Sequence, residues 1–297
     1  MNRIFNSTDS GTSTVASAHE RELLKAGNEY DMLCALLVRE YGIDLRAMDK
    51  SIVERKCRRY VDKHKLFSLA ECLDFIACDQ ARLQELGDVI YSQSTYFNRQ
   101  PDDFKFVVDT MIHGPGEVLA DETDTLNVWS LGCSTGQEVY TIAVYLMEHL
   151  GDCRSSRFRV IGSDCSYSAI EKARAGRYKS DDVRRLEPID YSKYFAKSDR
   201  QDELLARPEL CRHVTFSPFN LVTSDYKPHR DFACVFLRNA IDFHTPESKT
   251  LIMTNVRGAL RNGGYLILGE DPGIGKLGMC GYGYELIGDG RYRAAVG

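Results

Sequence analysis

The residues whose types and spacing could support chemistry begin with the string GCSTG at positions 132–136. Gly132, Ser134 and Gly136 fit the Gly-x-Ser-x-Gly elbow that presents the nucleophilic serine of a hydrolase. The same residues also fit a glycine loop between a strand and a helix, where exposed backbone amides hold a nucleotide-like cofactor. The two interpretations demand different partners elsewhere in the chain.

A hydrolase elbow requires an earlier strand that carries the oxyanion loop, then an acid and a histidine further along the chain. Everything before Asn127 has the pattern of helix or loop. No downstream histidine follows a strand end with an acid suitably before it; those available are His149, His213, His229 and His244. The sequence therefore disfavours a hydrolase.

A cofactor loop requires a first strand, a tight glycine turn, a helix that begins there, and an acid at the end of the second strand. The strand NVWSL precedes Gly132, a helix begins near Gln137, and Asp164 ends the run FRVIGSD. The loop lacks a full Gly-x-Gly-x-x-Gly, which favours a smaller adenosyl cofactor over a dinucleotide. A structural glycine turn with a capping Asp164 stays open as the alternative.

The elements that must position this loop follow from the hydrophobic pattern. From residue 126 onward, short apolar runs alternate with amphipathic segments, as expected of a doubly wound, mostly parallel sheet with helices on both faces. The runs are NVWSL, FRVIGS, DFACVFL and YLILG, with helices up to Leu150, from about Ser168 to Ala175 and from Pro246 to Leu260. Asp289-Gly290 predicts a hairpin and an antiparallel C-terminal edge.

The rest of the chain divides into further units. Apolar spacing of three and four from Glu20 to Ile90 predicts a small all-α domain. The predicted organisation is a flexible leader at 1–18, the helical domain at 19–92, a linker at 93–125 and an α/β domain at 126–297, with a small inserted subdomain at about 190–216. The first 20 residues are polar and unlike a signal peptide.

Composition narrows the class of protein. The net charge of −5 over 297 residues argues against a general nucleic-acid binder, and no stretch approaches 18 uninterrupted apolar residues. The ten cysteines form no Cys-x-x-Cys pair or metal-ligand cluster, so we expect small buried side chains in a reducing compartment. These features predict a cytoplasmic protein, and we expect a monomer.

Several motifs, in order from about residue 30 to the end, resemble the CheR family. Its members are S-adenosyl-L-methionine-dependent methyltransferases that esterify glutamate side chains on bacterial chemotaxis receptors. The segment VWSLGCSTGQEVYTIA is similar to the family's Trp-Ser-x-Gly-Cys-Ser block, and IGSDCSYSAIEKARAGRY is similar to its Thr-Asp-Ile-Asp segment. The segments STYFNRQPDDF, LRNAIDFHTPE and LRNGGYLILGE resemble three further blocks. The resemblance implies a Rossmann-like methyltransferase domain behind a helical domain.

The resemblance also implies roles for individual residues. Thr95 and Arg99 would reach the methionine half of the cofactor, with Arg99 pairing with a carboxylate, while Glu138 would meet the amino group and Asp164 the ribose. Asn220 and Leu221 would border the adenine. The remaining implied cofactor neighbours are Gln93, Gly132, Ser134, Gly136, Arg238 and Asn239. Structural alternatives are a linker salt bridge for Arg99, a turn for Asn220 and an ion pair within the fold for Arg238.

The segment ERKCRRYVDKHK, residues 54–65, is basic in an otherwise acidic protein. Helical spacing places Arg55, Arg58 and Arg59 near one face. A solvated surface is one interpretation and a nucleotide or second-messenger site is another. In the family that the chain resembles, this helix contacts acidic receptor helices, which favours docking on an acidic helical region of a chemoreceptor or related signalling protein.

Some positions depart from the family pattern. Asn98 replaces the second Phe of a Phe-Phe-Arg motif, Gln137 replaces the first of two Glu, and Gln93 and Ser166 stand where Asn and Asp are common. Phe243 occupies the position of a tyrosine beside the reacting groups. Two functions therefore stay open: an active protein-glutamate methyltransferase, its turnover attenuated by Phe243, and a cofactor-binding regulator that docks on a partner with little turnover. Neither calls for a metal.

Overall fold

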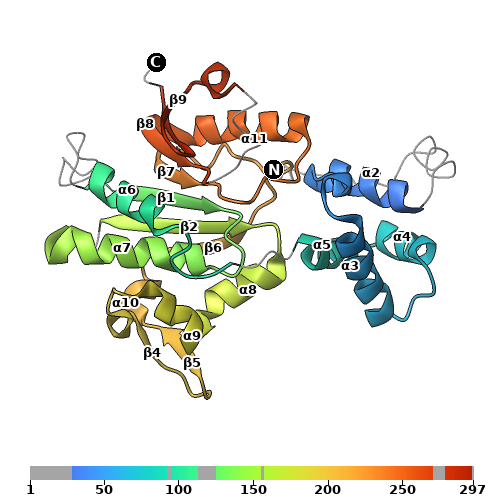
Figure 1. Ribbon diagram of the computed structural model, residues 1–297, viewed down its shortest axis with the longest axis horizontal. Coiled ribbons are helices and arrows are strands. Elements are labelled where there is room, and N and C mark those ends of the chain that lie inside the picture. Colours follow the sequence, from blue (N-terminus) through green and yellow to red (C-terminus); the bar gives the residue numbers. More distant parts are fainter. Residues whose placement is uncertain (1–28, 92–94, 113–124, 155–156, 270–277, 296–297) are drawn as a thin grey trace, which may run out of the picture.

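The computed structural model describes residues 29–91, 95–112, 125–154, 157–269 and 278–295, in which an α-helical domain lies beside one end of a larger α/β domain (Figure 1). The predicted leader at 1–18 and Gln93 lie outside these residues. The helical domain contains α2 (Glu29–Tyr41), η1 (Leu45–Ala47), α3 (Lys50–Lys63), α4 (Leu69–Ala77) and α5 (Gln80–Tyr91). The carboxylate of Asp49 and the hydroxyl of Ser68 accept backbone N–H groups at the starts of α3 and α4.

The α/β domain is built on a seven-stranded sheet in the order β6-β2-β1-β7-β8-β10-β9. The first five of these strands run parallel and β10 is antiparallel to both of its neighbours, as the sequence predicts. The bounds are β1 (Leu126–Leu131), β2 (Phe158–Asp164), β6 (Val214–Pro218), β7 (Phe232–Phe236), β8 (Leu260–Ile267), β9 (Tyr284–Gly288) and β10 (Arg291–Ala294). Residues 214–216, which the sequence assigned to the inserted subdomain, instead begin strand β6 beside β2.

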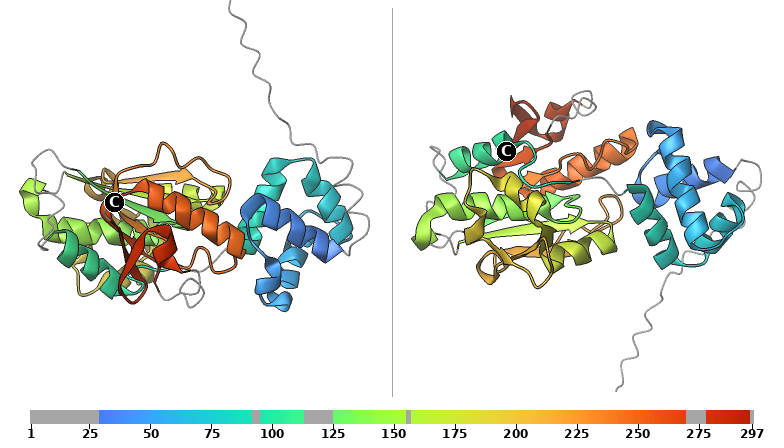
Figure 2. Two further views of the ribbon diagram at one scale, coloured as in Figure 1. Left: turned by 90° about the horizontal axis from the view of Figure 1, so that it is seen from above. Right: turned by 60° about the horizontal axis from the view of Figure 1, so that its bottom comes forward.

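Helices cover both faces of the sheet (Figures 1 and 2). Successive side chains of β1 point to opposite faces of the sheet, and both faces are apolar. Val128 packs in the core on the side of α7, and Trp129 packs in the core on the side of α11. The helices are α6 (Pro101–Met111), α7 (Gln137–Arg154), α8 (Tyr167–Ala175), α11 (Pro246–Ala259) and η5 (Met279–Tyr282). Helix α6 lies within the segment expected to be a linker, and its Phe104 and Met111 are buried in the core.

The inserted subdomain begins earlier than the sequence suggested, directly after α8. It carries a three-stranded antiparallel sheet in the order β3-β5-β4. Its elements are β3 (Arg177–Lys179), α9 (Ser180–Val183), η2 (Arg184–Leu186), η3 (Tyr191–Lys193), β4 (Phe195–Lys197), β5 (Glu203–Ala206) and α10 (Pro208–Cys211). Phe195 anchors it by stacking edge-on against Phe97 with ring centroids 5.6 Å apart.

The helical domain is hydrogen-bonded to the loop that follows β7. Residues 42–44 run antiparallel to residues 243–245: the Asp44 amide donates to the Phe243 carbonyl at 2.9 Å and the Thr245 amide donates to the Gly42 carbonyl at 2.9 Å. Gly42 has a φ of +70°, a left-handed conformation that favours glycine. The helical domain therefore holds one wall of the carboxyl edge of the sheet in place.

Hydropathy gives one further result for the described residues. None of their helices combines the length and the apolar character needed to cross a bilayer.

We predict that Gly42→Ala weakens this junction. A Cβ atom at Gly42 would lie 2.4 Å from the Ser248 Oγ and 2.6 Å from the Val222 Cγ2, on a backbone that disfavours side chains. The expected loss is about 1–3 kcal/mol in the free energy of unfolding, measured by urea denaturation. Gly258→Ala is the control, because that helical position has open space around it and alanine there is neutral or slightly stabilising. Equal stability of the two variants would contradict the prediction.

Candidate cofactor site

The loop between β1 and α7 is shaped by its two glycines. Gly132 and Gly136 have φ values of +75° and +92°, and a Cβ at Gly132 would lie 2.5 Å from the Ala240 Cβ. The Gly132 amide donates to the Ser163 carbonyl at 2.7 Å, which fastens the loop to the end of β2. Ser134 is also left-handed, with a φ of 50°. The loop therefore turns tightly with its backbone facing outward from the sheet edge.

Asp164 stands at the end of β2 beside this loop. One carboxylate oxygen accepts the Ser134 amide at 2.8 Å and the other accepts the Ser166 amide at 2.9 Å. Burial raises the pKa of Asp164, and these two amide hydrogen bonds oppose the rise. The Cys165 side chain also hydrogen-bonds Asp164, and a carboxylate has about four acceptor positions, so Asp164 is a fixed carboxylate that can accept one further donor.

A cavity of about 360 Å³ opens at this edge of the sheet. It brings together eight of the residues implied by the resemblance: Thr95, Gly132, Ser134, Asp164, Asn220, Leu221, Asn239 and Phe243. A second cavity of about 40 Å³ adjoins it and is lined by Thr95, Arg99, Glu138, Arg238 and Asn239, among others. Gly136 lines neither; a Cβ there would lie 2.8 Å from the Ala173 Cβ, so its smallness serves the packing of α8.

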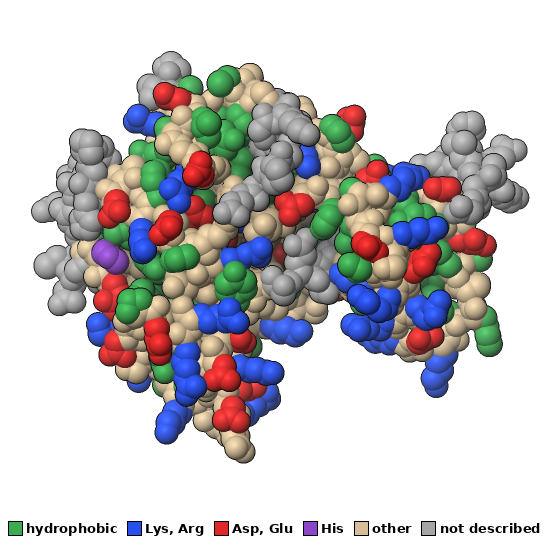
Figure 3. All heavy atoms as spheres, in the orientation of Figure 1, with side chains coloured by type: hydrophobic (Ala, Val, Ile, Leu, Met, Phe, Trp, Pro, Cys, Tyr) green, Lys and Arg blue, Asp and Glu red, His purple; other side chains and the backbone are tan. Residues whose placement is uncertain are grey.

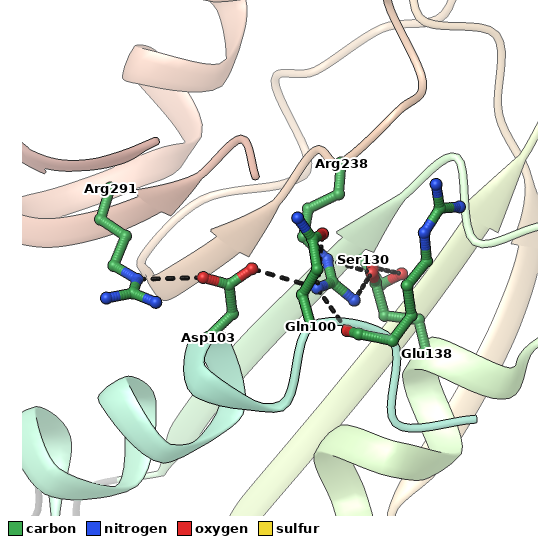
Figure 4. Close-up of polar contacts among 7 residues, drawn as sticks. Gln100, Asp103, Ser130, Glu138, Arg238 and Arg291 are labelled. Carbon is green, nitrogen blue, oxygen red and sulfur yellow. Dashed lines mark hydrogen bonds and ion pairs between the residues drawn. The ribbon is translucent and has the colours of Figure 1, made fainter. Parts of the chain in front are cut away.

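Arg238, which follows β7, is buried in a chain of alternating charges (Figure 4). Its guanidinium lies 2.7 Å from a Glu138 carboxylate oxygen and 3.1 Å from an oxygen of Asp103, and the other Asp103 oxygen accepts from Arg291 at 2.9 Å. Only 2% of the Arg238 side chain and 5% of the Asp103 side chain are exposed. Arg238 also donates to the carbonyl of Arg99 at 2.7 Å. Arg238 therefore forms the ion pair within the fold that the sequence analysis gave as its structural alternative.

Glu138 is fixed by the same chain. Its other carboxylate oxygen accepts the Ser130 hydroxyl at 2.8 Å. Arg99, in contrast, lines the small cavity, and its guanidinium lies 5.7 Å from the centre of the Tyr96 ring. Because Arg238 is neutralised by its partners and Arg99 borders the open space, Arg99 is the better placed of the two to receive an anionic group.

Asn220 acts as a turn residue and as a link between domains. Its amide oxygen accepts the Val222 amide at 2.9 Å, and its amide nitrogen donates to the Glu40 carbonyl at 2.8 Å. Phe243 faces the larger cavity and packs against the core of the helical domain. Both residues thus border the cavity while tying it to the helical domain.

Sequence reasoning missed the cavity residues that the helical domain supplies, Tyr41, Ile43, Gly87 and Asp88. No local motif marks them, because they reach the cavity only through contacts with the loops after β2, β6 and β7. Sequence reasoning also missed His244, which lines the same cavity. Burial, with a smaller contribution from Lys249, lowers the pKa of His244 to about 4, so its imidazole is neutral near pH 7.

Comparison with known proteins is consistent with this geometry. Residues 93–276 match the family model described as CheR methyltransferase, SAM binding domain. The chain is 25% identical over 251 residues to a chemotaxis protein methyltransferase of Borreliella burgdorferi, covering 83% of this chain and 88% of the relative. It is 26% identical over 276 residues to one from Klebsiella aerogenes, covering 91% and 90%, and 26% identical over 270 residues to one from Escherichia coli K12, covering 90% and 91%.

We predict that Arg238→Met destabilises the fold strongly. The change leaves the buried Asp103 and the partly buried Glu138 without their shared cation, and breaking a buried ion pair costs about 3–5 kcal/mol. Urea denaturation measures the loss. Arg184→Met is the matched control, because Arg184 pairs with Asp181 at the surface with 59% of its side chain exposed, and such pairs contribute about 0–1 kcal/mol. A loss as small as the control's would show that the chain of charges does not stabilise the fold.

Proposed function

The chain belongs to the CheR methyltransferase family, and from that premise we propose that it forms glutamate methyl esters on a chemotaxis receptor or a related signalling receptor. The methyl donor is S-adenosyl-L-methionine, whose binding domain is the part of the family that the chain matches. Support for the substrate comes from the relatives, which are named chemotaxis protein methyltransferases and align over most of this chain. The cavity at the carboxyl edge of the sheet is the observation that carries the proposal.

The residues around the cavity fit this cofactor. Asp164 has a free lone pair for a ribose hydroxyl, and Leu221 and Phe243 offer apolar surface to the adenine. The smaller cavity combines Arg99 with Glu138, a cation and an anion that match the carboxylate and the ammonium of the methionine half. Thr95 and Asn239 line both cavities and would lie where the two halves of the cofactor meet.

When bound, the cofactor supplies an electrophilic methyl group on a sulfonium sulfur. A glutamate side chain has a reference pKa of about 4.3 and is already ionised near pH 7, so the protein does not have to remove a proton. Its task is to align a carboxylate oxygen with the methyl group and to exclude water. Arg99 would hold the carboxylate of the cofactor's methionine half at the small cavity, while the helical domain covers the larger cavity at Tyr41 and Ile43.

Helix α3 is the proposed docking surface for the receptor. Arg55, Arg58 and Arg59 are exposed along it, and Lys and Arg side chains gather on the helical domain in Figure 3. A basic helix face of this kind attracts an acidic helical segment and accelerates the encounter. The helical domain that carries α3 also lines the cofactor cavity. A receptor bound to α3 is therefore held on the domain that covers the site.

Transfer of a labelled methyl group tests the proposal. The purified protein is incubated with S-adenosyl-L-methionine carrying a labelled methyl and with receptor cytoplasmic fragments, and base-labile label on glutamate is counted. Labelled ester is the expected result. If the protein binds the cofactor but labels none of the fragments, the alternative is correct: a cofactor-binding regulator that docks on its partner without turnover.

We predict that Arg55→Glu, Arg58→Glu and Arg59→Glu together weaken binding to the acidic receptor fragment by about tenfold or more at low salt, where exposed charges are least screened. Affinity for the cofactor stays unchanged because these side chains lie outside the cavity. A variant with Arg159, Arg184 and Arg212 changed to Glu carries the same net charge and is the control. Equal binding by both variants would exclude α3 as the docking surface.

We predict that Phe243→Tyr raises turnover. The phenylalanine ring lines the cavity, and a hydroxyl added to it could hydrogen-bond the substrate carboxylate and hold the attacking geometry. Such a bond to a charged group contributes about 1.5–3 kcal/mol, or roughly 10- to 150-fold in rate if it acts only in the transition state. The methyl-transfer assay measures kcat, and calorimetry should show cofactor affinity within a few-fold. An unchanged kcat would make Phe243 a neutral substitution.

A further inference from the structure

One carboxylate in the cofactor cavity comes from the helical domain. Asp88 lies near the end of α5 and is half-buried, and it lines the same cavity as Asp164. It also lines a groove of about 670 Å³ that continues from this cavity between the two domains. The cavity therefore has an acid on the sheet and another on a helix of the other domain.

Gln84 fixes Asp88 in this position. Its side-chain nitrogen donates to an Asp88 carboxylate oxygen at 3.2 Å and also to the carbonyl of Cys165, the residue that follows Asp164. Its side-chain oxygen accepts the Tyr41 hydroxyl at 3.3 Å. Asp88 is thus held to the turn after β2 by a bridge that uses one of its two oxygens.

The two carboxylates interact through their charges. Burial is the main reason that the pKa of Asp164 is raised, and the negative charge of Asp88 raises it further. Among the described residues neither carboxylate forms an ion pair with a cation, and the one lysine or arginine among the described residues that line the cavity is the exposed Lys172. Two acids that face one cavity repel each other unless hydrogen-bond donors lie between them.

We propose that Asp88 is a second acceptor for the ribose of S-adenosyl-L-methionine, so that the ribose diol is held between Asp164 on the sheet and Asp88 on α5. A ribose presents two neighbouring hydroxyl donors, and a carboxylate is an acceptor only. Asp164 accepts two backbone amides and the Cys165 side chain and retains one lone pair, and Asp88 retains an oxygen that Gln84 does not use. When each carboxylate accepts one ribose hydroxyl, both hydroxyl donors are satisfied and the ribose lies between the two negative charges.

Calorimetry with S-adenosyl-L-homocysteine tests the proposal without any receptor. Asp88→Asn keeps the oxygen that accepts from Gln84 and removes the charge, and it should weaken binding by about tenfold or more, as expected for a hydrogen bond to a charged acceptor. Asp88→Ala should weaken it at least as much. Asp74→Asn, an exposed acid on α4, is the matched control and should bind within twofold of the wild type.

Deoxy analogues identify the group that Asp88 contacts. The 2′-deoxy and 3′-deoxy forms of S-adenosyl-L-homocysteine each lack one hydroxyl, and the wild type should lose affinity for both. For the analogue that lacks the hydroxyl bound by Asp88, Asp88→Asn should cause no further loss of affinity. For the other analogue, Asp164→Asn should cause no further loss of affinity. If instead only an analogue without the adenine amino group removes the effect of Asp88→Asn, Asp88 contacts the base and the proposal is wrong.

Wild-type affinity in both Asp88 variants would also overturn the proposal and reduce Asp88 to a contact between the domains. In that case the wild type still binds S-adenosyl-L-homocysteine, so the assigned cofactor and the proposed receptor methylation are unaffected. Thermal unfolding without ligand checks that the variants are folded.

Discussion

The interaction on which the structure most depends is the neutralisation of one buried guanidinium. Arg238 lies just after β7 with 2% of its side chain exposed, and a charge buried this deeply is tolerated only when it is paired and hydrogen-bonded. Its partners come from α6, α7 and the backbone before α6, and Asp103 passes the pairing on to Arg291 in β10. One charge therefore links the starts of two helices, the loop of Arg99 and, through Asp103, strand β10.

Local patterns in the sequence predicted most of the sheet and, among the residues that line the cavity, the glycine loop and Asp164. The strand before Gly132, the acid at Asp164 and the hairpin at Asp289-Gly290 are short-range signals, and the structure contains each of them. Strand β6 was missed because its five residues follow an irregular insertion. Asp88 and Asp103 could not be predicted, because their roles depend on partners 76 and 135 positions away, and no periodicity encodes such pairings.

Two of the departures from the family pattern have structural explanations. Asn98 has a φ of 57°, which asparagine tolerates better than phenylalanine does, and its amide oxygen accepts the Tyr145 hydroxyl at 2.9 Å. Gln137 is buried at the start of α7 and accepts the Thr135 hydroxyl at 2.7 Å, so it orders the glycine loop without adding a charge. Both residues stabilise the backbone near the cavity, and neither substitution argues against turnover.

The position of α5 connects cofactor binding with the proposed docking of the receptor. Helix α5 borders the cofactor cavity at Gly87 and Asp88. It also packs against the basic helix α3. There, Lys56 donates to the Ile90 carbonyl at 2.8 Å and Tyr60 donates to the Arg82 carbonyl at 2.9 Å. A ligand that contacts both the sheet and α5 needs the two domains in the contact that the structure shows, so it stabilises that contact by mass action. Thermodynamic linkage then requires that, if the bound cofactor tightens receptor binding on α3 by some factor, the bound receptor tightens cofactor binding by the same factor.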